Sequence, residues 1–186
     1  MPNTWYGWVG TFTGVVAITV LSTPVAALTV CGLALARRRA GAEKPWQRSL
    51  AEVAMVYGTV PWVWMILLPG DRPFAELGPL NLVPLRDLLE MDAGQVVGNL
   101  AAFAVFGFFA PLRFPELASV RRVVTLVAGF TALLETAQYL WLDRVSSVDD
   151  VLLNTTGAGL AALLSSPLWQ RAGDRRSDMR AISRSA

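Results

Sequence analysis

Several residue types that carry familiar active-site chemistry are absent or rare in this sequence. It contains no histidine, which excludes Ser-His-Asp and Cys-His nucleophile systems and HExxH zinc sites. Its one cysteine, Cys31, can form neither an intrachain disulfide nor a CxxC site. Its one lysine, Lys44, lies outside any glycine-rich phosphate-binding pattern, so nucleotide binding is not expected. Any catalysis must use carboxylates, hydroxyl groups or arginines.

Charged residues are also scarce, at 16% of the 186 residues, whereas hydrophobic residues make up 54%. An ordinary soluble domain has about 25% charged residues. Several apolar runs approach the roughly 20 residues that a helix needs to cross about 30 Å of hydrocarbon. They lie at residues 11–35, 50–68, 95–112, 123–142 and 151–168. The sequence therefore predicts an all-α, polytopic transmembrane helical bundle with about five spans.

The basic residues predict how this bundle is oriented. Of the 16 lysines and arginines, all but Arg72, Arg86 and Arg144 follow the first, third or fifth span. Positive charge collects on the cytoplasmic side of membrane proteins. We therefore expect an outside N-terminus, a cytoplasmic C-terminus and a multi-pass protein of the cell (plasma) membrane. Membrane lipids are the expected partners, and the net charge of +2 gives no reason to expect nucleic acid.

The same patterns divide the chain into three regions. Residues 1–70 are predicted to form two N-terminal spans joined by a basic cytoplasmic loop. Residues 71–168 hold a long outer loop and three further spans. Residues 169–186 are rich in arginine and serine with little to bury, which predicts a disordered basic cytoplasmic tail.

The outer loop contains a segment that should lie at the membrane interface. Pro84 can start a short helix, and Leu85, Leu88 and Leu89 would then share one face. An apolar face of this kind lies in the interface plane. The segment is therefore predicted to form a lid over the helix bundle.

The fourth span carries polar residues on one helical face: Thr131, Glu135 and Gln138. Glu135 lies about 10 Å below the predicted outer end of the span, at 1.5 Å per residue. A carboxyl group at that depth is either protonated or paired with a cation. The nearest candidate cations on that side are Arg144 and Arg86.

The start of the fifth span combines a helix cap with a strip of small residues. Ser147 followed by Asp150 matches a capping box. Asp150, Asn154, Gly157 and Ala161 share one face, so the strip should allow a neighbouring helix to pack closely.

Antiparallel packing would gather these polar side chains into one outward-facing pocket. Glu135, Asp149 and Asp150 are the candidate catalytic residues, and they are also candidate oxygen ligands of a divalent cation. The candidate binding residues are Asn81, Pro84, Asn99, Gln138, Arg144 and Asn154. The alternative is structural, because Asn99 can form an interhelical hydrogen bond and acids at a helix N-terminus complement its dipole.

At these positions the sequence resembles the VanZ-like membrane protein family. The resemblance covers residues 81 to about 165, and Ser147 stands where the family frequently has a further Asp. The matching motifs are Asn-x-x-Pro (Asn81, Pro84), a Gly-Asn that opens a span (Gly98, Asn99, with Phe103 and Gly107), Glu-x-x-Gln (Glu135, Gln138) and Arg-x-x-x-x-Asp-Asp-x-x-x-Asn-x-x-Gly (Arg144, Asp149, Asp150, Asn154, Gly157).

The resemblance implies a cell-envelope role linked to glycopeptide (teicoplanin) resistance. The favoured hypothesis is a non-catalytic protein whose pocket binds the headgroup of a lipid-linked cell-wall precursor or a glycopeptide, because the acids have a capping explanation and no nucleophile is identifiable. One alternative is a carboxylate- or metal-dependent enzyme that transfers or hydrolyses a lipid-linked intermediate. Another is a small proton-coupled transporter, although no internal repeat is visible.

Overall fold

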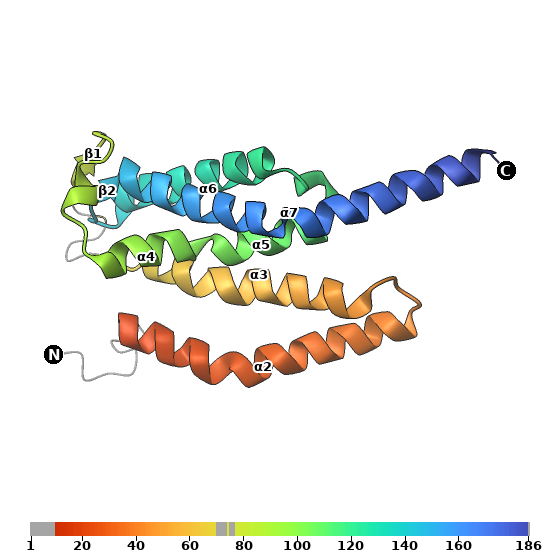
Figure 1. The fold of residues 1–186 in the computed structure, drawn as a ribbon. Helices are drawn as coiled ribbons and strands as arrows, with labels where there is room; N and C mark the ends of the chain where they lie inside the picture. Colours follow the sequence, from red (N-terminus) through yellow and green to blue (C-terminus); the bar gives the residue numbers. More distant parts are fainter. Residues whose placement is uncertain (1–9, 70–73, 75–76, 186) are drawn as a thin grey trace.

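The computed structural model is a bundle of long helices that lie side by side (Figure 1). It describes residues 10–69, 74 and 77–185, and residues 172–185 as helical backbone alone. Five helical segments in the described chain are long and apolar enough to span a membrane, which confirms the all-α polytopic prediction. The helices are α2 (Phe12–Arg39), α3 (Pro45–Ile66), α4 (Ala93–Ala102), α5 (Ala104–Arg113), α6 (Val120–Trp141) and α7 (Val148–Ser185).

Four short elements complete the fold: β1 (Leu80–Asn81), η1 (Asp87–Leu89), η2 (Pro115–Leu117) and β2 (Ser146–Ser147). The end of the bundle that holds β1, η1 and β2 is called the loop end (Figure 1). The opposite end holds the α2–α3 turn and the α5–α6 connection, and is called the basic end.

Helix α7 is the central element of the bundle. It packs against α4, α5 and α6, whereas α2 packs chiefly against α3. The buried core lies among α4 to α7, with Trp62, Val63 and Ile66 of α3 packed against it. Its buried members are Ala102, Phe103, Val123, Val127, Leu134, Ala158 and Ala162.

The third predicted span is divided into two helices. Phe103 ends α4 and precedes α5 with φ −116° and ψ 8°, which are not helical values. Its ring is buried and packs edge to face on Phe130, with 5.8 Å between the ring centroids. The apolar run predicted one continuous span, because hydrophobicity does not reveal a local change in backbone direction.

Two glycines let α7 approach this divided span on both sides of Phe103. A Cβ atom on Gly157 of α7 would lie 1.9 Å from the carbonyl oxygen of Leu100. A Cβ atom on Gly107 of α5 would lie 2.2 Å from the carbonyl oxygen of Ala158. Since real Cβ atoms cannot approach that closely, both contacts require glycine. The predicted small-residue strip is therefore confirmed as a close helix-packing surface.

Helix α7 also extends further than the sequence predicts. The expected span ended at residue 168 and a disordered tail was expected from residue 169, but the helix continues to Ser185. Extending an existing helix avoids the unfavourable nucleation step, so even a polar segment can remain helical when it follows a stable span. Composition alone does not contain that information.

Replacing Gly157 by alanine should therefore destabilise the bundle. The added methyl group overlaps the backbone of α4, and such overpacking typically costs about 1 to 3 kcal/mol in unfolding free energy. Thermal unfolding in detergent micelles, followed by circular dichroism, measures the effect. The matched control is Gly129→Ala in α6, where the new Cβ meets nothing within 4 Å. The unfolding temperature of this variant should stay the same or rise slightly, because alanine favours the helix more than glycine does. Equal unfolding temperatures for both variants would contradict the close contact.

Candidate functional site

The long loop of residues 77–92 is attached to the connection between α6 and α7. Strands β1 and β2 pair in parallel, with Leu80 opposite Ser146 and Asn81 opposite Ser147. The amide of Ser146 donates to the carbonyl oxygen of Pro79 at 2.9 Å. A Cβ atom on Gly78 would lie 2.0 Å from the carbonyl oxygen of Arg144, so this approach requires glycine. The loop is therefore docked on the bundle and does not extend away from it.

The start of this loop and the preceding Phe74 satisfy carbonyl groups in the last turn of α6. The amide of Phe74 donates to the Trp141 oxygen and the amide of Gly78 donates to the Tyr139 oxygen, each at 2.9 Å. Carbonyl groups in the last turn of a helix have no partner within the helix. The C-terminal end of α6 is thus capped by a segment that is distant in the sequence.

Glu135 of α6 is hydrogen-bonded to the connection between α6 and α7. Its carboxylate accepts a hydrogen bond of 2.9 Å from the backbone amide of Ser147, and Glu135 is 7% exposed. Ser146 and Ser147 are buried as well, because the connection folds inward to reach the level of Glu135. The predicted position of Glu135 on the inner face of α6, together with Thr131 and Gln138, is confirmed by the burial of all three side chains.

The expected cation partner of Glu135 is not present within the described part of the chain. Arg144 makes no ion pair with Glu135, Asp149 or Asp150, and its guanidinium donates to the carbonyl oxygen of Leu68 at 3.2 Å. A cation was predicted as the partner of Glu135 from charge alone. In the structure the donor to its carboxylate is instead the backbone amide of Ser147.

Ser147 caps α7, but the predicted capping box is only half formed. The Ser147 hydroxyl accepts from the amide of Asp149 at 3.2 Å, as an N-cap should. In a capping box the side chain of Asp150 would accept from the Ser147 amide. Glu135 takes that amide instead, and Asp150 accepts from the side-chain amide of Asn99 on α4. Asn99 and Asp150 therefore join α4 to α7, as the structural alternative for Asn99 expects.

Asp149 anchors the loop through both of its carboxylate oxygens. One oxygen accepts from the amide of Leu85 at 2.6 Å and the other from the amide of Leu88 at 3.1 Å. Asp149 is 1% exposed, so both hydrogen bonds are shielded from solvent. This role resembles the capping of a helix, applied here to a loop that starts more than sixty positions earlier in the sequence.

The lid segment differs in detail from its prediction. Pro84 was predicted to start a short helix, but it begins a turn in which Leu85 has φ 65°, and the helix comprises only the single 3-10 turn Asp87–Leu89. Leu88 is partly buried, whereas Leu85 is 59% and Leu89 87% exposed. The three leucines therefore do not share one face. The hydrogen bonds from the Leu85 and Leu88 amides to Asp149 hold the segment in a turn and not in a helix.

The remaining predicted binding residues do not share a common site. Gln138 donates to the carbonyl oxygen of Ile66 at 2.7 Å. Asn154 is 2% exposed, and its side-chain oxygen has no hydrogen-bond partner among the described residues. Asn81 donates to Asp87 and accepts from the Val83 amide at 3.1 Å, which fixes the loop internally.

The three candidate catalytic carboxylates do not converge on one point. Within the described residues, no group of three acidic, histidine or cysteine side chains could hold a metal ion. Glu135 is directed at Ser147, Asp149 at the loop amides and Asp150 at Asn99. The donor set of Glu135, Asp149 and Asp150 therefore does not fit a divalent cation.

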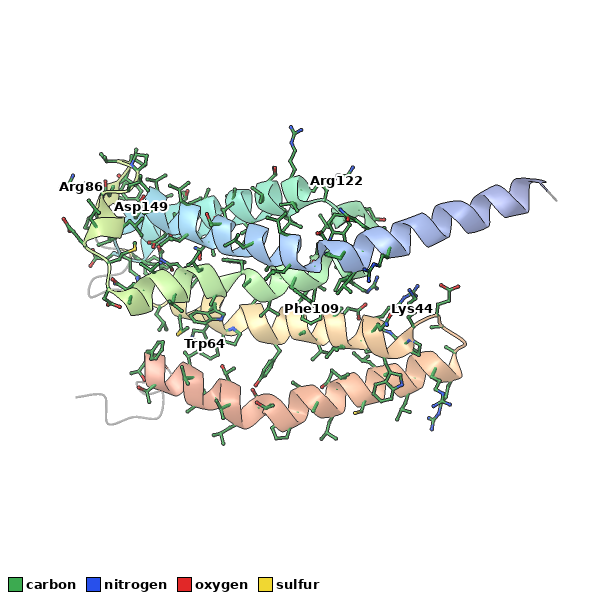
Figure 2. All side chains as sticks on the ribbon, viewed as in Figure 1. Lys44, Trp64, Arg86, Phe109, Arg122 and Asp149 are labelled. Carbon is green, nitrogen blue, oxygen red and sulfur yellow. The ribbon has the colours of Figure 1, made fainter. Side chains whose placement is uncertain are left out.

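The loop end also holds an open pocket, which none of these three carboxylates lines. This shallow, open cavity of about 220 Å³ is lined by Pro79, Leu80, Asn81, Arg86, Asp87, Glu90 and Val145. Only Asn81 among them was selected as a site residue from the sequence. Arg86 was considered only as a cation partner of Glu135, although its place as one of three basic residues outside the basic clusters could also have marked it as a binding residue. Figure 2 shows Arg86 and Asp149 together at the loop end.

The comparison with family models agrees with this architecture. The model described as VanZ/LLP1 matches residues 55–170, which include most of α3, all of α4, α5 and α6, and the membrane-spanning part of α7. The chain belongs to the VanZ/LLP1 family. No curated protein and no solved structure matches it. The family region therefore contains the docked loop and every hydrogen bond that fixes it.

The Asp149→Asn variant should loosen the docked loop of this VanZ-family protein. Asparagine keeps one acceptor oxygen, so one of the two loop amides loses its partner, and a hydrogen bond to a charged group contributes about 1.5 to 3 kcal/mol. Hydrogen–deuterium exchange in detergent should then accelerate about tenfold or more at Leu85 and Leu88. Glu90→Gln, in the same loop but exposed, is the matched control and should leave exchange unchanged. Unchanged exchange in Asp149→Asn would refute the anchoring role.

Proposed function

We propose that this VanZ-family membrane protein binds the polar headgroup of a lipid-linked cell-wall precursor or a glycopeptide at its loop end, and thereby contributes to teicoplanin resistance. The proposal places the loop end outside the plasma membrane. Support for that orientation comes from the basic end, where Arg37, Arg38, Arg39, Arg113, Arg121 and Arg122 follow the first and third spans. Positive charge of this density marks the cytoplasmic side.

The cavity at the loop end is the observation that carries the proposal. Arg86 lines it and is exposed, and the described residues provide no hydrogen-bond or ion-pair partner for its guanidinium. A guanidinium can bind a phosphate or carboxylate through two parallel hydrogen bonds. Asn81, Asp87 and Glu90 add amide and carboxylate groups that can bind hydroxyl and amine groups of a headgroup.

The surface around the cavity suits a ligand that carries a lipid chain. Three exposed apolar side chains of the docked loop lie next to cavity-lining residues in the sequence: Leu82, Leu85 and Leu89. An apolar rim beside a polar cavity lets one molecule place its headgroup in the cavity and its chain in the membrane interface.

The acids of the loop end support binding more than catalysis. Asp149 uses both oxygens for backbone amides, and Glu135 and Asp150 each accept a hydrogen bond from a separate element. A pair of catalytic carboxylates must both reach the reacting group of one bound substrate. These three carboxylates instead hold the α6–α7 connection, the docked loop and α4 in place.

Removal of the Arg86 charge tests the proposal. A bacterium that expresses Arg86→Gln should lose most of the teicoplanin resistance that the wild-type protein confers, since losing a charge-assisted hydrogen bond weakens binding about tenfold or more. The measurement is the minimal inhibitory concentration at matched protein levels. Native mass spectrometry of the purified proteins should show that wild type retains a lipid that Arg86→Gln has lost.

The matched control is Arg39→Gln, an exposed arginine at the basic end. It should keep both the resistance and the co-purifying lipid. The cavity would not be the binding site if Arg86→Gln kept full resistance. The same conclusion would follow if Arg39→Gln lost as much resistance as Arg86→Gln. If wild-type protein confers no resistance, the link to teicoplanin is wrong.

A further inference from the structure

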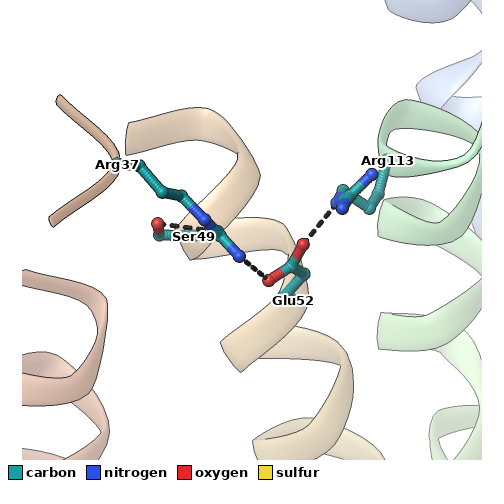
Figure 3. A network of polar contacts seen from close by, with 4 residues as sticks. All are labelled: Arg37, Ser49, Glu52 and Arg113. Carbon is teal, nitrogen blue, oxygen red and sulfur yellow. Dashed lines mark hydrogen bonds and ion pairs between the residues drawn. The ribbon is translucent and has the colours of Figure 1, made fainter. Parts of the chain in front are cut away.

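A second polar cluster lies at the basic end, far from the loop-end cavity. Glu52 of α3 lies between Arg37 of α2 and Arg113 of α5 (Figure 3). One Glu52 oxygen accepts from Arg37 Nη2 and the other from Arg113 Nε, each at 2.5 Å. Arg37 also donates through Nη1 to the buried hydroxyl of Ser49 at 2.9 Å. The sequence does not reveal this cluster, because Arg37, Glu52 and Arg113 lie on three different helices and no local pattern links them.

The cluster carries surplus positive charge. Two guanidinium groups share one carboxylate, so one positive charge remains uncompensated within the cluster. Glu52 allows the two arginines to lie near one another in spite of their mutual repulsion. Arg48, one helical turn before Glu52 on α3, adds another positive charge to the same helix face.

Arg113 has hydrogen-bonding capacity that the described residues do not use. Only its Nε donates to Glu52, and its two terminal amino groups have no partner in the described part of the chain. Its guanidinium carbon lies 4.9 Å from the centroid of the Phe114 ring, which restricts the orientation of the group. Its side chain is 28% exposed and is therefore accessible from the surface.

The position of the cluster indicates its ligand. Arg37 lies in the last turn of α2, and Arg113 ends α5, the second half of the divided third span, so both lie where a candidate membrane span leaves the hydrocarbon. Trp46, at the start of α3, is 46% exposed at the same end, and tryptophan is enriched at the headgroup level. The anionic group available at that depth is the phosphodiester of a phospholipid, and guanidinium geometry matches phosphate oxygens.

We propose that Arg113, held by Glu52 beside Arg37, binds the phosphate of an anionic phospholipid at the basic end. The free terminal amino groups of Arg113 donate to the phosphate oxygens, and the surplus charge of the cluster attracts the anion. This site is independent of the loop-end cavity. It uses Arg37 and Glu52, which precede the family match, together with Arg113 inside it.

Lipid titration of the purified protein tests the proposal. The wild type, in mixed micelles of phosphatidylcholine with increasing phosphatidylglycerol, should retain one phosphatidylglycerol by native mass spectrometry and should be stabilised against heat by it. Arg113→Gln should weaken this retention about tenfold. The matched control is Arg121→Gln, an exposed arginine at the same end, which should bind phosphatidylglycerol as the wild type does.

Two further measurements separate lipid binding from a loss of folding and from binding of any phosphate. Arg113→Lys retains a cation for Glu52 and should fold normally, yet it should still retain less phosphatidylglycerol than the wild type, because an ammonium lacks the planar pair of donors. Inorganic phosphate in place of the lipid should give no comparable heat protection. Any of three results would overturn the assignment. They are wild-type retention of phosphatidylglycerol by Arg113→Lys, a loss of retention in Arg121→Gln equal to that in Arg113→Gln, and heat protection by inorganic phosphate equal to that by the lipid.

Discussion

The hydrogen bond from the Ser147 amide to Glu135 determines how the loop end of this protein is built. A backbone amide that is buried in a membrane protein must find an acceptor, because no bulk water is available to it. Glu135 provides that acceptor from about two helical turns inside α6. The α6–α7 connection consequently folds toward the interior of the bundle, where Ser146 and Ser147 are buried.

Further contacts depend on this inward fold. It presents Ser146 and Ser147 as a short strand with which Leu80 and Asn81 pair, and it places Asp149 where both carboxylate oxygens meet the loop amides. The loop then closes the end of α6 and forms one wall of the cavity that Arg86 lines. Each acid of the family motif thus satisfies backbone or side-chain donors, and the cavity is a consequence of the resulting architecture.

The sequence predicted most of the fold for a clear physical reason. Span length and hydrophobicity identify membrane helices directly, and helical periodicity identified the inner face of Glu135 and the packing strip of Gly157. The partners of the acids were not predictable in the same way, since periodicity gives the face of a helix but not the atom that it meets. The division of the third span at Phe103 and the Glu52 cluster depend on contacts between distant segments, which no local pattern encodes.

The two ends of the molecule divide the polar chemistry between them. At the loop end, buried carboxylates hold backbone and leave one arginine beside a cavity. At the basic end, one carboxylate holds two arginines and leaves positive charge in surplus. Between them, glycine contacts such as Gly157 with Leu100 hold the helices too closely for larger side chains.

The most direct test of this account compares Glu135→Gln with Glu135→Leu. Glutamine keeps an oxygen that can accept the Ser147 hydrogen bond, so the unfolding temperature should stay near the wild-type value, and so should any teicoplanin resistance that the proposed function assigns to the protein. Leucine leaves the amide without an acceptor, which should lower the unfolding free energy by about 1 to 3 kcal/mol. A Glu135→Gln protein that folds normally but confers no resistance would contradict the account, because the function would then require a carboxyl group that ionises.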